Sequence, residues 1–182
     1  MRTVILTGFM GTGKSSVGRV LARLTGLTYV DLDARIVAQA GRTINEIFAE
    51  QGEAAFRALE SEMLQSLCRQ EGIILSTGGG AVLSSVNRAV MKAEGMVINL
   101  TAPVPVIRER LRHATDRPLL QDAAVSDKIE RMLDEREASY AEADIRIDTA
   151  GKKIEDIAAE IVAVLELDSK GVFSGTIDGL TG

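Results

Sequence analysis

The sequence predicts an α/β fold, a three-layer αβα sandwich in which helices cover both faces of a five-stranded parallel sheet. Two observations support this prediction. Short aliphatic segments alternate along the chain with longer segments whose apolar residues recur at helical spacing, as in proteins with parallel sheets. The length of 182 residues suits one domain that buries roughly 70 % of the surface of the unfolded chain.

The strands that this alternation predicts are rich in Val, Ile and Leu. They are expected at Thr3 to Thr7, Thr28 to Asp31, Gly72 to Ser76, Met96 to Leu100 and Asp144 to Asp148. Helices are expected at Val17 to Leu24, Phe56 to Cys68, Val86 to Ala93, Val104 to Arg112 and Asp127 to Tyr140. Because ligands gather at the carboxyl ends of parallel strands, the residues that follow each strand are candidates for a site.

Composition narrows the class of protein. The formal net charge is −5 and the isoelectric point is near 5.0, which argues against a nucleic-acid partner. No apolar stretch reaches the roughly 18 residues of a membrane helix. The single cysteine, Cys68, forms no internal disulfide, and no Cys and His cluster has metal-ligand spacing. We therefore expect a cytoplasmic protein that acts on a small molecule. A monomer is expected, although nothing in the sequence reports the oligomeric state.

One domain is expected over residues 1–165. From residue 166 onward, glycines are scattered among Ser, Thr and Asp. This composition predicts a flexible tail over residues 166–182, or a remnant of cloning, and we assign the segment no function.

A complete phosphate-binding pattern, G-x-x-x-x-G-K-[ST], runs from Gly8 to Ser15 directly after the first predicted strand. Its glycines let backbone N–H groups point at phosphate oxygens, and the following helix presents its positive N-terminal end to the same anion. Lys14 adds mobile positive charge, and Ser15 offers a hydroxyl to Mg²⁺. The alternative, a glycine turn that merely opens a helix, is disfavoured by the strand and helix on either side.

Two carboxylates, Asp31 and Asp33, close the second predicted strand. Alternation along an extended chain would place both on one side, with Leu32 on the other. One carboxylate near the phosphate loop can hold Mg²⁺ through water, and the other can accept a proton from an attacking hydroxyl. Equally, Asp33 can simply cap a helix that begins at Ala34. Local sequence leaves both interpretations open.

Three consecutive glycines, Gly78 to Gly80, follow the third predicted strand. Ordering glycine costs more backbone entropy than ordering any other residue, so their presence indicates close approach of a ligand or another backbone. A flexible turn is the alternative.

Several charged side chains remain ambiguous. Arg57 and Glu60 are three residues apart on a predicted helix and can pair on its surface, where such a pair contributes only about 0.2 to 0.5 kcal/mol. Arg136 lies in a charged run and, like that pair, can be an ordinary solvated residue. Arginines between 108 and 117, including Arg110 and Arg117, suit a lid that closes over a triphosphate and excludes water.

Taken together and in order, these motifs resemble the shikimate kinase family, whose members are phosphate-loop enzymes of the nucleoside monophosphate kinase fold. The resemblance covers residues 1–165. Its motifs are Gly8-x-x-Gly11-x-Gly13-Lys14-Ser15-x-x-Gly18, Asp31-x-Asp33, Gly52-Glu53-x-x-Phe56-Arg57-x-x-Glu60, Gly78-Gly79-Gly80, Arg117-Pro118-Leu119, and Arg136 followed by Tyr140. It implies a substrate-binding helical segment over residues 33–60 and a lid over residues 112–124.

The resemblance also implies an activity. Members transfer the γ-phosphoryl group of ATP to the 3-hydroxyl of shikimate, with Mg²⁺, in the biosynthesis of chorismate and the aromatic amino acids. By similarity, Lys14, Asp33 and Arg117 are the catalytic residues. Glu60 would orient Arg57, and Arg110 would pack on adenine. The implied ATP contacts are Gly11, Thr12, Gly13, Lys14, Ser15, Ser16, Arg110 and Arg117; the implied shikimate contacts are Asp33, Arg57, Glu60, Gly78, Gly79, Gly80 and Arg136; and the implied magnesium ligands are Ser15 and, through water, Asp31.

Two other functions compete with this one. A sugar-acid kinase such as a gluconate kinase shares the fold and also binds a carboxylate, and a nucleotide-binding sensor would keep the phosphate loop without catalysis. The combination of Arg57, Gly78 to Gly80 and Arg136 favours shikimate over gluconate. A sensor should have lost the acceptor-site residues, whereas Asp33, Arg57 and Arg136 all remain. One departure from the family concerns the segment Ala150 to Lys153, where relatives often carry an arginine and an Asn-Pro pair; contacts from this segment to adenine are therefore left open.

Overall fold

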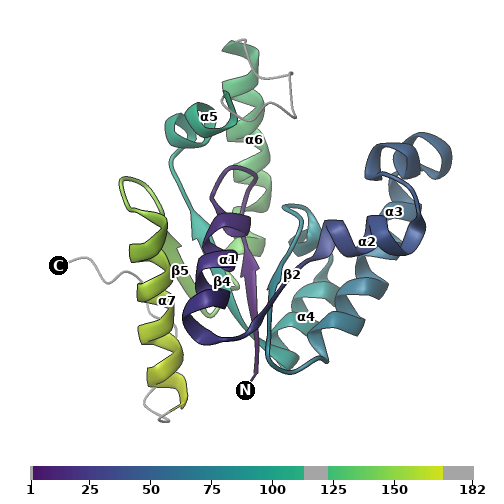
Figure 1. Cartoon of the computed structure of the whole chain (residues 1–182). Helices are drawn as coiled ribbons and strands as arrows, with labels where there is room; N and C mark the ends of the chain where they lie inside the picture. Colours follow the sequence, from purple (N-terminus) through teal and green to yellow (C-terminus); the bar gives the residue numbers. More distant parts are fainter. Residues whose placement is uncertain (1, 113–122, 170–182) are drawn as a thin grey trace.

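The structure is a computed structural model, and it describes residues 2–112 and 123–169. Strands and helices alternate as the sequence predicts (Figure 1). The strands are β1 (Thr3–Thr7), β2 (Thr28–Asp31), β3 (Ile73–Ser76), β4 (Gly95–Thr101) and β5 (Ile145–Asp148). The helices are α1 (Lys14–Thr25), α2 (Leu32–Ala40), α3 (Ile44–Cys68), α4 (Ser85–Glu94), α5 (Val104–Arg112), α6 (Ala123–Tyr140) and α7 (Ile154–Ser169), and a short 3-10 turn, η1 (Ala81–Leu83), precedes α4.

The sheet has five strands in the order β2-β3-β1-β4-β5, and every neighbouring pair is parallel. Each predicted strand lies within one residue of its observed bounds. In the centre, Val4 of β1 stands opposite Ile74 of β3 on one side and Met96 of β4 on the other. The segments that leave β1, β3 and β4 therefore begin next to one another at the carboxyl edge of the sheet, where a ligand site is expected.

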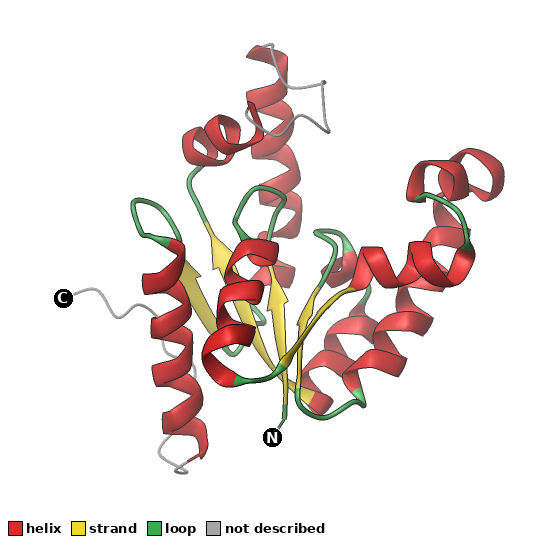
Figure 2. Ribbon diagram, viewed as in Figure 1, coloured by secondary structure: helices red, strands yellow, loops and turns green. Residues whose placement is uncertain are grey.

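Helices cover both faces of this sheet, which confirms the predicted sandwich (Figure 2). Val4 and Leu6 of β1 pack with Ile161 of α7 in one buried cluster that also includes residues of α1. Ile5, which points to the opposite face, packs with Leu64 of α3 and with residues of α4 in a second cluster. Because both faces are buried, the strands are continuous apolar runs rather than alternating ones.

One helix on the sheet was not among the predicted elements. Helix α7 buries Ile157, Ile161 and Val164, whose spacing is helical, against the sheet. It continues through Ser169, so residues 166–169 are helical and the tail predicted from residue 166 begins too early. The rest of that tail, residues 170–182, lies outside the described residues.

Helix α3 begins twelve residues before the helix that the sequence predicted. Thr43 caps it: its Oγ1 accepts a hydrogen bond from the Glu46 amide, and Glu46 Oε2 accepts one from the Thr43 amide at 2.7 Å. Gly52 then interrupts the helix with a φ of 81°, a left-handed value that favours glycine. The helix therefore bends, and together with α2 its first part forms a lobe beside the sheet (Figure 1).

Within the described part of the chain, we find no helix that is both long enough and apolar enough to cross a membrane.

Candidate active site

A cavity of about 1080 Å³ opens at the carboxyl edge of the sheet. Residues from seven separate segments line it: the loop after β1 with the start of α1, the end of β2 with the start of α2, helix α3, the end of β3 with the loop after it, helix α5, helix α6, and the loop after β5 with the start of α7. The predicted site residues that it brings together are Gly11, Thr12, Gly13, Lys14, Ser15, Ser16, Asp31, Asp33, Arg57, Glu60, Gly78, Gly79, Gly80, Arg110 and Arg136. Arg117 and most of the predicted lid lie outside the described residues.

The loop from Gly8 to Ser15, hereafter the phosphate loop, folds as its pattern predicts. Gly8, Gly11 and Gly13 have positive φ values of 138°, 82° and 96°. A side chain on Gly8 would overlap the Leu100 carbonyl oxygen, so only glycine fits there. Gly13 then serves as the N-cap of α1, which points the first amides of that helix into the cavity.

Hydrogen bonds within the phosphate loop fix its shape. The Thr12 hydroxyl donates to the Phe9 carbonyl at 2.8 Å, and the Lys14 ammonium donates to the carbonyls of Gly8 and Phe9 at 2.7 and 2.9 Å. Thr12 is buried, and its hydroxyl closes the loop. The Lys14 charge is thus held over the loop, beside the amides that face the cavity.

The structure corrects the geometry expected for Asp31 and Asp33. Helix α2 begins at Leu32, so the alternation of β2 stops at Asp31 and does not place Asp33. The helix cap is Asp31, whose Oδ1 accepts a hydrogen bond from the Ala34 amide at 3.1 Å; the proposed capping role of Asp33 is wrong. Asp33 lies in the first turn of α2 and, like Asp31, lines the cavity, with its Oδ1 buried.

Arg57 and Glu60 form an ion pair with a distance of 2.7 Å between Nη1 and Oε2, but the pair is not on the surface. The Glu60 side chain is 2 % exposed and that of Arg57 is 33 % exposed. Burial raises the pKa of Glu60, and the opposing effect of Arg57 does not cancel this rise. Glu53 holds the other side of the guanidinium, at 3.2 Å from Nη2. Arg57 is therefore fixed by two carboxylates, with its guanidinium at the cavity wall.

The three glycines at 78–80, hereafter the glycine loop, make room for charged side chains. A Cβ on Gly78 would stand 2.9 Å from Asp33 Oδ1 and 3.1 Å from Glu60 Oε1. A Cβ on Gly80 would stand 2.6 Å from Arg57 Nη1. Close approach of these side chains explains Gly78 and Gly80.

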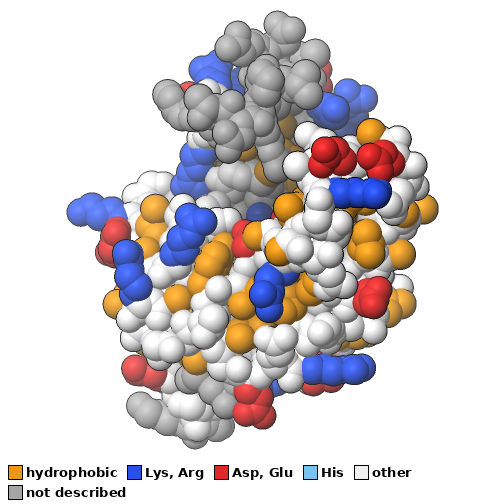
Figure 3. Space-filling model, turned by 45° about the vertical axis from the view of Figure 1, so that its right-hand side comes forward, with side chains coloured by type: hydrophobic (Ala, Val, Ile, Leu, Met, Phe, Trp, Pro, Cys, Tyr) orange, Lys and Arg blue, Asp and Glu red, His pale blue; other side chains and the backbone are white. Residues whose placement is uncertain are grey.

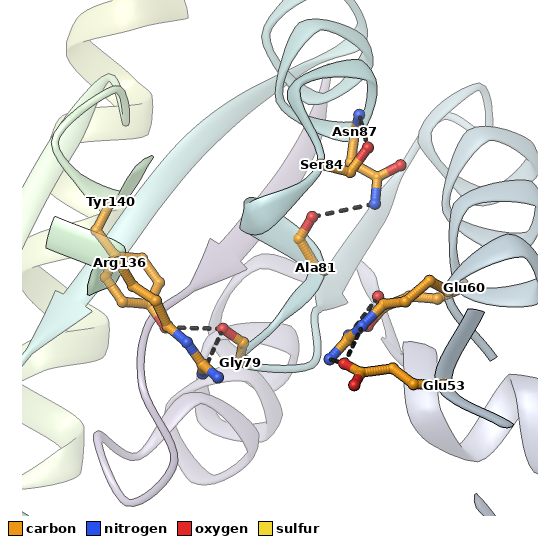
Figure 4. Close-up of polar contacts among 9 residues, drawn as sticks. Glu53, Glu60, Gly79, Ala81, Ser84, Asn87, Arg136 and Tyr140 are labelled. Atoms are coloured by element: carbon orange, nitrogen blue, oxygen red, sulfur yellow. Dashed lines mark hydrogen bonds and ion pairs between the residues drawn. The ribbon is translucent and has the colours of Figure 1, made fainter. Parts of the chain in front are cut away.

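Arg136 of α6 reaches the glycine loop from the other side. Its Nη1 donates to the Gly79 carbonyl at 3.2 Å, and its guanidinium lies 5.6 Å from the centre of the Phe9 ring. Figure 4 shows Arg136 and Glu60 on opposite sides of Gly79. Since Arg57 adjoins Gly80, the two arginines flank the glycine loop.

Arg110 links the phosphate loop to the loop after β5. Its Nη1 donates to the Gly11 carbonyl at 3.2 Å and to Thr149 Oγ1 at 2.9 Å, and its Nη2 donates to the Thr149 carbonyl at 2.8 Å. The guanidinium is thereby held at the cavity wall between the phosphate loop and the loop after β5.

Sequence reasoning missed part of the lining. Ile44, Phe48 and Phe56 form an apolar wall, in which the two phenylalanine rings lie 4.8 Å apart. The Thr43-x-x-Glu46 capping pattern predicts a helix start before this wall and was the available signal. Lys152 and Lys153 also line the cavity, in the segment where the sequence departs from the family.

The cavity lining carries an excess of positive charge, although the chain as a whole is acidic. Six cationic and four acidic side chains of the described residues line it, although the chain has a formal net charge of −5. On the face drawn in Figure 3, acidic and basic side chains are interspersed among neutral ones. An excess of cations in the cavity suits the binding of anions such as phosphates and carboxylates.

Known proteins resemble this chain over nearly its whole length. The family model of shikimate kinase matches residues 10–166. The shikimate kinase of Geobacter metallireducens is 56% identical over 166 residues, which cover 91% of this chain and 93% of that protein. The solved structure of shikimate kinase from Acinetobacter baumannii in complex with shikimate has a TM-score of 0.85 and 34% identity, and the match covers 92% of this chain and 94% of that one. A gluconokinase from Sinorhizobium meliloti shares the fold, with a TM-score of 0.59 and 16% identity over 94% of this chain and 95% of that one.

Proposed function

The chain belongs to the shikimate kinase family, and we propose that its cavity binds ATP beside the phosphate loop and shikimate between α2, α3 and α6. The chain is an ATP-using kinase that converts shikimate to shikimate 3-phosphate, with ADP as the second product. The observation that carries our division of the cavity is the placement of Arg57 and Arg136 on either side of the glycine loop, whereas Lys14 is bonded to carbonyls of the phosphate loop itself.

We call the part of the cavity that binds ATP, the phosphoryl donor, the donor side. There, the amides of the phosphate loop and of the first turn of α1 bind the phosphates of ATP. Gly11 to Ser16 supply these contacts, because they line the cavity at a helix N-terminus. Lys14 moves from the loop carbonyls to the terminal phosphates and neutralises the charge that develops during transfer. Arg110 lies against adenine at the far end. Arg117, outside the described residues, stays a prediction as a second phosphate contact.

Ser15 and Asp31 fit a magnesium ion on this side. Both line the cavity, and both offer oxygen, the ligand atom that Mg²⁺ prefers in proteins. Asp31 already accepts hydrogen bonds from the Tyr29 hydroxyl and the Ala34 amide, so we assign it a contact through water. When bound, the ion neutralises charge on the transferring phosphates.

We call the part of the cavity that binds shikimate, the phosphoryl acceptor, the acceptor side. There, Arg57 and Arg136 bind the carboxylate of shikimate. The planar guanidinium group can donate two parallel hydrogen bonds to a carboxylate, which orients the ring as well as holding it. Glu60 fixes the orientation of Arg57 through their ion pair. The apolar wall of Ile44, Phe48 and Phe56 excludes water from the ring.

Asp33 is the proposed general base. It lines the cavity beside Gly78, and a carboxylate there accepts the proton of the 3-hydroxyl. The freed oxygen forms a bond to the γ-phosphorus while the bond between that phosphorus and the ADP oxygen breaks. The proton ends on Asp33, and ADP leaves with the electron pair of the broken bond.

The direct test measures ADP release with shikimate or gluconate at equal concentrations. We expect shikimate-dependent ADP release, with gluconate near the background of ATP alone. Faster turnover with gluconate would assign the chain to the sugar-acid kinases. Tight ATP binding without shikimate-dependent ADP release would indicate the nucleotide-binding sensor.

A monomeric state and a cytoplasmic location stay proposals. Sedimentation equilibrium of the full chain tests the first. A mass near 19.5 kDa over the range of assay concentrations is expected for a monomer.

A further inference from the structure

Two side chains of α6 donate to one oxygen atom of the glycine loop. Tyr140 Oη lies 2.8 Å from the Gly79 carbonyl oxygen, and Arg136 Nη1 lies 3.2 Å from the same atom (Figure 4). The two residues are four apart on the helix, so they share a face. A carbonyl oxygen has two lone pairs and can accept both bonds at once.

Tyr140 is the more firmly fixed of the two donors. The residue is 3 % exposed, and it belongs to the core cluster that includes Ala81, Val97 and Ala143. Burial raises the pKa of its phenol above the usual value of 10.0, so the hydroxyl stays protonated at any ordinary assay pH. The hydroxyl is therefore a permanent donor with little freedom to move.

Arg136, in contrast, has a second task. If it binds the substrate carboxylate, the acid competes with the Gly79 carbonyl for its N–H groups. The hydrogen bonds to the Gly79 carbonyl are partly buried, and a partly buried carbonyl that loses a donor costs free energy unless another donor remains. Tyr140 provides that donor.

The position of Gly79 also matters to its neighbours. Gly78 contacts Asp33 and Glu60 closely, and Gly80 contacts Arg57 closely. On the far side of the loop, Asn87 Nδ2 holds the Ala81 carbonyl at 3.0 Å (Figure 4). If the Gly79 carbonyl shifted, Gly78 and Gly80 would move with it and would displace the side chains that we assign to acid binding.

We propose that Tyr140 is a positioning residue for the acid substrate: its hydroxyl holds the Gly79 carbonyl so that Arg136 is free to turn to the carboxylate. This inference rests on the proposed function, because it needs Arg136 to bind the acid. It assigns Tyr140 an effect on the affinity for shikimate and none on ATP.

The test is Tyr140→Phe, which removes the hydroxyl and keeps the ring. We expect the KM for shikimate to rise about three- to tenfold, the range that one hydrogen bond supplies. The kcat and the KM for ATP should stay within about twofold. The matched control is Thr3→Val, which removes a buried hydroxyl bonded to Cys68 and Gln70 carbonyls at the opposite end of β1. It should lower the Tm without a change in either KM.

A double-mutant cycle with Arg136→Ala separates positioning from stability. If Tyr140 acts through Arg136, Tyr140→Phe should have a much smaller effect on the KM for shikimate in the Arg136→Ala background. An equal factor in both backgrounds, or a lower Tm with an unchanged KM for shikimate, would overturn the inference and leave the proposed function intact. If Arg136→Ala itself left the KM for shikimate unchanged, the carboxylate assignment would fail, and this inference with it.

Discussion

The two sides of the cavity are built in different ways. The proposed phosphate-binding part of the donor side is one continuous segment, Gly8 to Ser16, and the shape of its loop is set by its own glycines and by hydrogen bonds within it. The acceptor side is assembled from α2, α3, the glycine loop and α6, which contribute Asp33, Arg57 and Arg136 from distant parts of the chain. The proposed phosphate site is thus set by a local motif, whereas the proposed acid site depends on tertiary structure.

The largest effect is expected on the donor side. Lys14→Met removes the cation over the phosphate loop, and loss of such charge stabilisation should lower kcat about 10²- to 10³-fold. Steady-state ADP release measures the loss. Lys128→Met is the matched control, because Lys128 is exposed on α6 and does not line the cavity.

This variant also tests the separation of the two sides. Calorimetry should find shikimate binding nearly unchanged in Lys14→Met. A loss of shikimate affinity as large as the loss of kcat would place Lys14 in the acceptor site, and the contrast between the two sides would break down.

A smaller effect is expected from crowding on the acceptor side. In Gly80→Ala, the new methyl group would stand 2.6 Å from Arg57 Nη1, so the guanidinium must move. Displacing one half of the carboxylate site should raise the KM for shikimate about tenfold, since charge-assisted hydrogen bonds are the strong ones. The KM for ATP should stay within about twofold.

The control for this substitution is the same change in an Arg57→Ala background. There the methyl group meets no guanidinium, so Gly80→Ala should add little. A tenfold rise in that background as well would mean that the methyl group blocks the substrate directly.

The same contrast explains what the sequence could predict. The phosphate loop and the strands depend on local pattern, and the structure confirms them. The pairing of Arg57 with Glu60 follows from helical spacing, but the burial of Glu60 depends on packing against the glycine loop, which no local pattern reveals. Sequence indicated that Asp31 and Asp33 share a pocket, yet the helix begins at Leu32 and gives that result by a different geometry.

Other parts of the site needed the whole fold. The strand order decides which loops meet at the sheet edge, and it depends on crossovers that the sequence pattern does not specify. Phe48 lies before the helix that was predicted, and only the bend at Gly52 brings both Phe48 and Phe56 to the same wall. Lys153 was left without a role because it follows the last strand in a segment without a recognised motif.

The KM for shikimate should depend on pH through Glu60, a residue of the acceptor side. Burial raises the pKa of Glu60 above its usual value of 4.5, so Glu60 gains its proton at a higher pH than an exposed glutamate does. As the pH falls through that raised pKa, the charge that orients Arg57 is lost, and the KM for shikimate should rise about three- to fivefold. At higher pH, Glu60 is ionised and the pair is intact. Initial rates measured between pH 7 and pH 5 test this.

Glu60→Gln is the control for the pH dependence, since glutamine does not titrate. Its KM for shikimate should be raised at pH 7 and should vary less with pH than that of the unmodified chain. An identical pH profile in both proteins would assign the acidic limb to another group, such as Asp33.

The smallest effect on the reaction is expected from a change at the N-terminal cap of α3, because the cap stabilises this helix without touching the substrate. Thr43→Ala removes the side-chain half of the capping box of α3 and should lower the free energy of unfolding by about 1 kcal/mol. Denaturant unfolding measures this change, and Thr43→Ser, which keeps the hydroxyl, should restore most of it. Both KM values should stay within about twofold, because Gly52 separates the capped segment from Arg57 and Glu60. A larger rise in the KM for shikimate would show that the first part of α3 sets the acid site through Phe48, which would extend the tertiary assembly of the acceptor side to the lobe.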